Sequence, residues 1–251
     1  MKTDYYCRGC GKNRALHLFA IILFLCIIIF YSCNDQEEYS DTPGVVLSFD
    51  DYFPETWEQS FDLLEKYDAK VTFFVTAGKG TPFMLKAQER GHEIGFHTIT
   101  HPFLPEISKE QFYIETVSKT DTFRAYGIEL TSFAYPYGEY ESWMNEELLK
   151  YYKVVRGFGS KKKLYTKETM KYGYIYSISI DNTRFSSETV FKKYINDILY
   201  SAKKHGMIIP LTSHSVNDNE WGITPERLEY VLNKCREYEL PVYSYKHFQE
   251  N

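Results

Sequence analysis

The sequence predicts an α/β domain built on a parallel sheet, and three observations lead to this prediction. Predicted strands and helices alternate about seven times, no long linker or internal repeat interrupts them, and chemically useful polar side chains follow several strands. Such alternation is typical of crossover connections between parallel strands, in an open sheet or in a closed barrel. Periodicity favours neither form, and in both the functional residues collect at the carboxyl ends of the strands.

The strands are predicted from short runs rich in β-branched and aromatic residues. In chain order they cover residues 45–49, 71–75, 93–97, 131–134, 154–155, 174–180, 207–211 and 242–244. The helices are predicted from apolar spacing with capping residues, including capping boxes at Thr56 with Gln59 and at Ser108 with Gln111. They begin near residues 56, 83, 108, 142, 186 and 224, and Gly91, Gly127 and Gly206 close three of them.

Composition excludes several classes of protein. The 251 residues are 43% hydrophobic and 25% charged, which is typical of a compact domain and not of a disordered chain. Five Cys are too few for a disulfide scaffold of this length. The formal charge of −5 argues against a nucleic-acid partner held by phosphate attraction.

The N-terminus has the pattern of an export signal. Four basic residues and one acidic residue within residues 1–14 precede an apolar run at residues 15–31. The small Ser32 followed by Cys33 resembles a bacterial lipoprotein signal, in which Cys33 is acylated. We expect residues 1–32 to be a signal peptide or, alternatively, an uncleaved membrane anchor, and residues 33–43 to be a polar linker. Both alternatives place a domain at residues 44–251 outside the cytoplasm, tethered to a membrane.

Three predicted strand ends carry the groups that a metal site needs. Asp50 and Asp51 follow the first strand, His97 and His101 follow the third, and His214 follows the strand at residues 207–211. Two imidazoles four residues apart can converge, and a carboxylate from a neighbouring strand completes three ligands. Three protein ligands with an open position are typical of a catalytic zinc-type site. Taken alone, an Asp-Asp pair after a strand is often a helix cap or a solvated turn, and a His-x-x-x-His pair is usually two unrelated surface or core histidines.

Taken together, these segments resemble the NodB-type polysaccharide deacetylases, carbohydrate esterase family four, over roughly residues 44–246. The segments that carry the resemblance are residues 48–51, 91–101, 133–138 and 211–214, in the family's order. The resemblance implies a distorted (β/α) barrel of about seven parallel strands, as a single domain after the N-terminal signal or anchor.

The resemblance also implies the roles of the site residues. A divalent metal, zinc or alternatively cobalt or nickel, would be bound by Asp51, His97 and His101. Asp50 would be the general base, His214 the general acid, and the backbone N–H of Tyr137 a donor to the oxyanion. A metal activates water and polarises the carbonyl, while the carboxylate and the imidazole transfer protons.

The sequence departs from the family pattern in several places. Ala134 stands where the family has an Arg that orients the base, and Arg156 or Arg184 could replace it; we favour Arg156 slightly. Asp181 keeps the first Asp of the fourth motif and is expected to pair with His214 and raise its pKa.

The predicted substrate contacts follow from the same segments. Thr212 stands where the family has a Leu lining the acetyl pocket, Tyr135 lies in the third motif, and Trp221 follows a strand end and could stack on a sugar ring.

The sequence thus predicts a metal-dependent hydrolase that removes acetyl groups from an acetylated polysaccharide or oligosaccharide. One alternative keeps the fold but hydrolyses other carbon–nitrogen amides, of the cyclic ureide or imide type. Another alternative is a glycan-binding lipoprotein whose catalysis has lapsed.

Overall fold

The computed structural model describes residues 43–76, 81–159 and 163–249. The expected signal or anchor at residues 1–32, the expected acylation site Cys33 and nearly all of the expected linker at 33–43 lie outside these ranges. Within them, no helix combines the length and the apolar character needed to cross a membrane.

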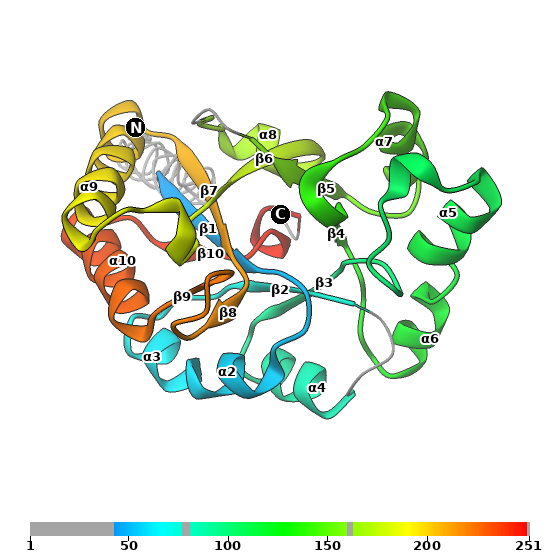
Figure 1. Ribbon diagram of the computed structural model, residues 1–251, viewed down its shortest axis with the longest axis horizontal. Coiled ribbons are helices and arrows are strands. Elements are labelled where there is room, and N and C mark those ends of the chain that lie inside the picture. Colours follow the sequence, from blue (N-terminus) through cyan, green and yellow to red (C-terminus); the bar gives the residue numbers. More distant parts are fainter. Residues whose placement is uncertain (1–42, 77–80, 160–162, 250–251) are drawn as a thin grey trace, which may run out of the picture. The chain divides into compact units, whose positions relative to one another are not determined.

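Seven parallel strands close into a barrel (Figure 1). The strands are β1 (Gly44–Phe49), β2 (Thr72–Val75), β3 (Glu93–Phe96), β4 (Ser132–Ala134), β5 (Val154–Phe158), β6 (Gly173–Ser179) and β7 (Ile208–Ser213). Each strand pairs with the next one along the chain, and β7 pairs with β1 from Gly44↔Ile208 to Phe49↔Ser213. This last pairing decides between the open sheet and the barrel and confirms the expected single (β/α) barrel.

A short strand from the C-terminus completes the sheet. β10 (Val242–Tyr243) pairs with the beginning of β1, where Val45 is opposite Val242, whereas β2 pairs with the end of β1. Tyr245 and Phe248 follow β10 and are buried against the apolar residues inside the barrel.

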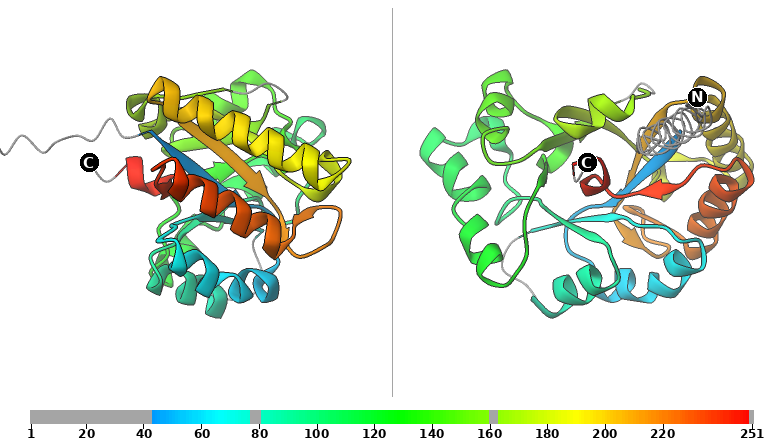
Figure 2. Two further views of the ribbon diagram at one scale, coloured as in Figure 1. Left: turned by 90° about the vertical axis from the view of Figure 1, so that its left-hand side faces the viewer. Right: turned by 180° about the vertical axis from the view of Figure 1, so that it is seen from behind.

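Helices surround the strands on the outside (Figures 1 and 2). They are α2 (Pro54–Gln59), α3 (Phe61–Lys66), α4 (Thr81–Glu89), α5 (Lys109–Thr116), α6 (Thr120–Ala125), α7 (Ser142–Leu148), α8 (Lys167–Lys171), α9 (Glu188–His205) and α10 (Pro225–Glu237). The helices α9 and α10 lie side by side in Figure 2, with the rings of Phe191 and Tyr230 6.1 Å apart. Because alternate residues of a strand face opposite sides, each barrel strand buries one set against the helices and the other set inside the barrel.

Two helix starts differ from the prediction. The first helix begins at Pro54, since proline is well suited to a first helical turn, so Thr56 is not its cap. The Thr56 hydroxyl instead accepts a hydrogen bond from the Val216 N–H at 3.2 Å. The helix predicted from Ser142 is capped one residue earlier, by Glu141.

Two predicted helices are each divided in two. The first breaks at Ser60 into α2 and α3, and the one predicted over residues 108–127 is α5 and α6. The expected cap of α5 is present, because Ser108 Oγ accepts from the Gln111 N–H at 3.1 Å. At the C-terminal end of α9, Gly206 has a φ of 64°, a left-handed conformation that favours glycine, so it closes this helix as predicted.

Candidate active site

A cavity of about 580 Å³ lies at the carboxyl ends of the strands. Its polar lining consists of Asp50, Asp51, His97, His101, Ser179, Asp181 and His214, and its aromatic walls are Phe53, Tyr137, Phe158 and Trp221. The closed barrel brings these residues together because the carboxyl ends of all parallel strands meet at one end.

Asp51, His97 and His101 form a cluster with the geometry of a metal site. Asp51 Oδ1 lies 3.3 Å from Nε2 of each histidine, and one ligand atom from each residue falls within 4.8 Å of the others. Nδ1 of His97 lies 2.8 Å from the Ala134 carbonyl oxygen, to which it donates its N–H, so the lone pair on Nε2 faces Asp51.

The donor set fits a divalent cation. Among the described residues, the buried Asp51 Oδ1 has no hydrogen-bond partner. Burial, followed by the charge of His97, lowers the pKa of His101, which favours the neutral imidazole. For Asp51, burial acts to raise the pKa, but the adjacent imidazole of His97, followed by those of His214 and His101, outweighs it and lowers the pKa to about 2. A carboxylate and two neutral imidazoles are the ligand forms of these side chains.

Backbone strain also gathers at this cavity. Asp51, Thr98, His101 and Tyr137 have φ values of 76°, 69°, 60° and 60°, in the left-handed region that non-glycine residues seldom adopt. Such conformations cost on the order of 1–3 kcal/mol each and concentrate at functional sites. The strain therefore supports the assignment of this cavity as the site.

Glu115 holds the loop between the two histidines, a role that no sequence motif indicated. Its carboxylate accepts hydrogen bonds from the N–H groups of Ile99 and Thr100, at 3.0 and 2.9 Å, and from the Thr100 hydroxyl at 2.8 Å. A single Glu on a predicted amphipathic helix carries no signal for this role, because the loop it binds is set by the tertiary fold.

Asp50 is fully buried and paired with Arg156. Nη2 of Arg156 donates to both carboxylate oxygens at 2.5 Å each. Arg156 and Ala134 are opposite each other in the ladder between β5 and β4, so an Arg on the adjacent strand reaches Asp50. Arg184, the other candidate, is exposed and lies over the ring of Tyr194.

Two aromatic rings hold the guanidinium of Arg156. Its Cζ atom lies 5.1 Å from the ring centre of Phe74 and 4.6 Å from that of Phe158. Both contacts are within the range of cation–π attraction. Phe158 was missed because the strand was predicted to end at residue 155; extending it by alternation would have placed Phe158 on the same face as Arg156.

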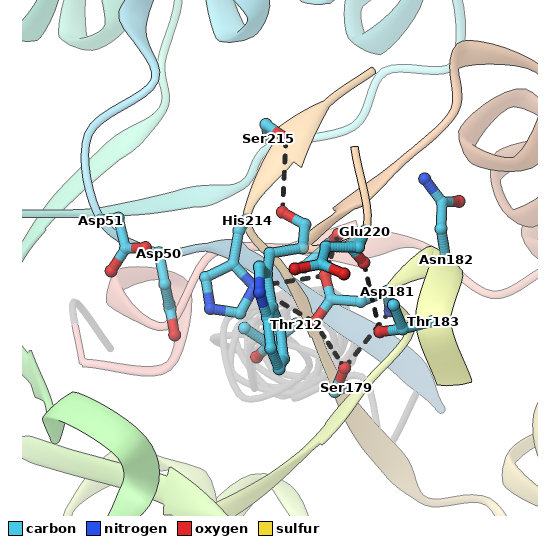
Figure 3. Close-up of polar contacts among 12 residues, drawn as sticks. Asp50, Asp51, Ser179, Asp181, Asn182, Thr183, Thr212, His214, Ser215 and Glu220 are labelled. Atoms are coloured by element: carbon cyan, nitrogen blue, oxygen red, sulfur yellow. Dashed lines mark hydrogen bonds and ion pairs between the residues drawn. The ribbon is translucent and has the colours of Figure 1, made fainter. Parts of the chain in front are cut away.

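His214 is tethered to Asp181, as Figure 3 shows, with its ring between Asp181 and the Asp50–Asp51 pair. Nδ1 of His214 lies 3.1 and 3.2 Å from the two oxygens of Asp181. Those oxygens also accept from the hydroxyls of Ser179 and Ser213, each at 2.7 Å. Burial acts to lower the pKa of His214, but the hydrogen bond to Asp181 and the charge of Asp50 outweigh it and raise the pKa to about 9.

The three expected substrate contacts have different positions. Trp221 is 59% exposed, and its ring lies 6.1 Å from that of His214 in the cavity wall. Thr212 is fully buried inside the barrel, deeper along β7 than His214, where its hydroxyl bonds to Ser48 Oγ at 2.8 Å and to Ser177.

Tyr135 is fully buried and packs on the outer side of the sheet, because Ala134 before it faces the barrel interior. Its hydroxyl donates to Asn145 Oδ1 at 3.0 Å. Contrary to the expectation from sequence, neither Tyr135 nor Thr212 lines the cavity.

The fold and the site define a (β/α) barrel with a candidate metal and acid–base centre at its strand ends. Residues 38–154 match the family model described as polysaccharide deacetylase, so this part of the chain is similar to that family. The matched stretch includes Asp50, Asp51, His97, His101 and Tyr137. Asp181 and His214 lie beyond it.

Solved structures share this fold. A chitin deacetylase from Colletotrichum lindemuthianum is 17% identical, with a TM-score of 0.62 over 84% of this chain and 89% of that one. A peptidoglycan deacetylase from Bacillus subtilis is 16% identical, with a TM-score of 0.57 over 82% and 90%. A family 4 carbohydrate esterase from Streptomyces lividans, in complex with acetate, is 14% identical, with a TM-score of 0.60 over 80% and 91%. A comparison with curated protein sequences gave no match.

Proposed function

We propose that this protein is a metal-dependent hydrolase that removes acetyl groups from an acetylated glycan. One observation carries the proposal: a single cavity joins the Asp51–His97–His101 cluster to two further tethered groups, Asp50 and His214. A cation site, a carboxylate and an imidazole are the parts that metal-assisted acyl hydrolysis needs.

The cluster of Asp51, His97 and His101 would hold the divalent metal. Zinc suits this set of one carboxylate and two imidazoles, and cobalt or nickel are the alternatives. When bound, the metal would polarise the acetyl carbonyl and activate a water molecule.

The chain's own residues would carry the protons. Asp50, held by Arg156, accepts a proton from the attacking water as the new carbon–oxygen bond forms. His214, held protonated by Asp181, gives its Nε2 proton to the departing nitrogen or oxygen as the bond to the acetyl carbon breaks. The products are acetate and the free amine or hydroxyl of the sugar. Tyr137, whose backbone is held at a φ of 60°, would direct its N–H to the oxyanion.

Aromatic side chains at the mouth of the cavity support a sugar substrate. Trp221 and Tyr137 are each 59% exposed and lie in the walls of the cavity. Phe103 extends this surface, with its ring 6.1 Å from that of Tyr137. Exposed rings beside polar groups offer a surface for the apolar faces of sugar rings, and the acidic lining disfavours polyanionic substrates.

Acetate release from N-acetylated and O-acetylated oligosaccharides tests the proposal. The full-length protein is assayed as purified, after chelation, and after adding back zinc, cobalt or nickel, with Asp50→Asn as the control. We expect metal-dependent release that is lost in Asp50→Asn. Release that survives complete chelation would contradict the metal-dependent mechanism. Metal binding without acetate release from any glycan would direct the assay to cyclic ureides and imides, and the absence of metal binding would favour a glycan-binding protein.

We also propose that the protein is exported and tethered to a membrane through acylated Cys33. The basic start, the apolar run and the Ser32–Cys33 pair support this proposal. Labelling with a fatty-acid analogue in a bacterial host is expected to mark the protein but not its Cys33→Ser variant. An unlabelled protein that still fractionates with membranes would indicate an uncleaved anchor instead.

A further inference from the structure

Two neighbouring residues of α2 hold the main chain that directly follows the His214 side chain. The indole N–H of Trp57 donates to the His214 carbonyl oxygen at 2.7 Å. The Thr56 hydroxyl accepts from the Val216 N–H at 3.2 Å. Trp57 is fully buried, and its ring lies 5.0 Å from Phe73.

These contacts continue the pairing between β1 and β7 beyond the end of the strands. The last rung is the bond from the Asp50 N–H to the Ser213 carbonyl oxygen, at 3.0 Å. The next carbonyl along that chain, that of His214, is taken by Trp57. The indole N–H therefore makes the first hydrogen bond after the pairing between the two strands ends.

Asp51, the metal-site residue, and Trp57, which carries the indole, lie on the same short segment that follows β1. α2 begins at Pro54, three residues after Asp51, and the Phe53 carbonyl accepts from the Trp57 N–H at 3.0 Å and from the Thr56 hydroxyl at 3.2 Å. Since Trp57 is locked to the loop that follows Asp51, its bond to His214 fixes the separation between the two sides of the cavity.

We infer that Trp57 is a positioning residue for proton donation by His214, an inference that rests on the proposed function. Asp181 holds the imidazole through Nδ1, and Trp57 holds the main chain from which that imidazole extends. Loss of the indole N–H frees the His214 carbonyl and lets the ring shift away from the departing atom. A shift of about 1 Å at such a group can cost on the order of 100-fold in rate.

Two kinds of leaving group separate this role from a structural one. An acetylated amino sugar or alkyl ester needs a proton on the departing atom, whereas 4-nitrophenolate leaves without one. In the full-length, metal-loaded protein, Trp57→Phe keeps an aromatic ring but removes the N–H. We expect kcat for the acetylated sugar to fall about tenfold or more, KM to change little, and kcat for 4-nitrophenyl acetate to fall less than about twofold.

Two further variants control for lost packing. Phe61→Leu removes aromatic volume from the same cluster, in which the rings of Phe61 and Phe73 lie 6.1 Å apart, without touching His214. It is expected to lower stability and to affect both substrates equally. Thr56→Val keeps the shape of the side chain but replaces the hydroxyl by a methyl group. We expect it to lower kcat for the acetylated sugar less than Trp57→Phe does, again with little effect on 4-nitrophenyl acetate.

His214→Ala provides the reference for loss of the acid. Like Trp57→Phe, it should lower kcat for the acetylated sugar more than kcat for 4-nitrophenyl acetate. Adding Trp57→Phe to it should cause no further loss of kcat on the acetylated sugar. If Trp57→Phe lowers kcat equally on both substrates, as expected for Phe61→Leu, the inference is overturned while the proposed function stands. If His214→Ala lowers kcat equally on both substrates, the acid role of His214 is refuted, and the inference with it.

Discussion

Replacing Arg156 by Ala removes the guanidinium that holds Asp50. Both side chains are fully buried, and one nitrogen of Arg156 contacts both carboxylate oxygens. Removing one partner of a buried ion pair leaves an uncompensated charge, which typically costs about 3–5 kcal/mol. Asp50 then either destabilises the fold by that amount or takes up a proton, and a protonated Asp50 cannot act as a base.

The effect on rate follows from the role of the base. General-base catalysis contributes about 100- to 10,000-fold, so losing the orientation or the charge of Asp50 should cost more than about tenfold in kcat/KM for acetate release. Arg156→Lys should recover little, because an ammonium lacks the planar group that lies between the rings of Phe74 and Phe158. Denaturant unfolding of each variant separates lost stability from lost catalysis.

A double substitution sharpens this test. Ala134 is opposite Arg156 in the ladder, so Ala134→Arg combined with Arg156→Ala moves the guanidinium to the adjacent strand, at the position where the family that the sequence resembles has an Arg. We expect this variant to regain most of the lost rate, while Ala134→Lys combined with Arg156→Ala serves as the matched control. An unchanged rate in Arg156→Ala, or a well-folded double variant as slow as Arg156→Ala, would refute the reasoning.

Three further predictions concern the rest of the site. His214 acts in its protonated form, so the rate should fall as pH rises through its pKa, which Asp181 raises to about 9 in the protein without metal. Asp181→Asn should move this alkaline fall in rate to lower pH. A pH profile that does not move would contradict the pairing of Asp181 with His214. His101→Ala should weaken zinc binding by at least about tenfold in calorimetry with a similar melting temperature, and unchanged binding would exclude His101 as a ligand. Trp221→Ala should raise KM for an oligosaccharide about fivefold with kcat within about twofold, whereas an unaltered KM would place the sugar elsewhere.

The strands could be predicted because their signal is local. Runs such as 45–49 and 71–75 are apolar and rich in β-branched or aromatic residues, and the structure has strands there. Helix boundaries were less accurate, because the start at Pro54 and the break at Ser60 depend on how the segment packs. Whether Thr56 caps a helix or accepts a bond from Val216 depends on a residue 160 positions away.

The positions of the site residues were predictable to different extents. Asp51 lies two residues after β1 and His101 five residues after β3, so parallel strands bring them to one end of the barrel. Thr212 also lies on a strand, but its depth in the barrel, which decides whether it reaches the cavity, depends on the stagger of neighbouring strands. The tertiary structure places it beside the hydroxyls of Ser48 and Ser177 instead.

Local patterns of apolar and polar side chains account for the alternation of strands and helices and for the residue types at the strand ends. Three contacts follow only from the three-dimensional arrangement: the closure of the sheet through β1 and β7, the pairing of Asp50 with Arg156 and not with Arg184, and the bond from Trp57 to His214. Each of these contacts joins residues more than 100 positions apart. Such contacts depend on how the closed barrel staggers its strands, a property of the whole chain that no local pattern encodes.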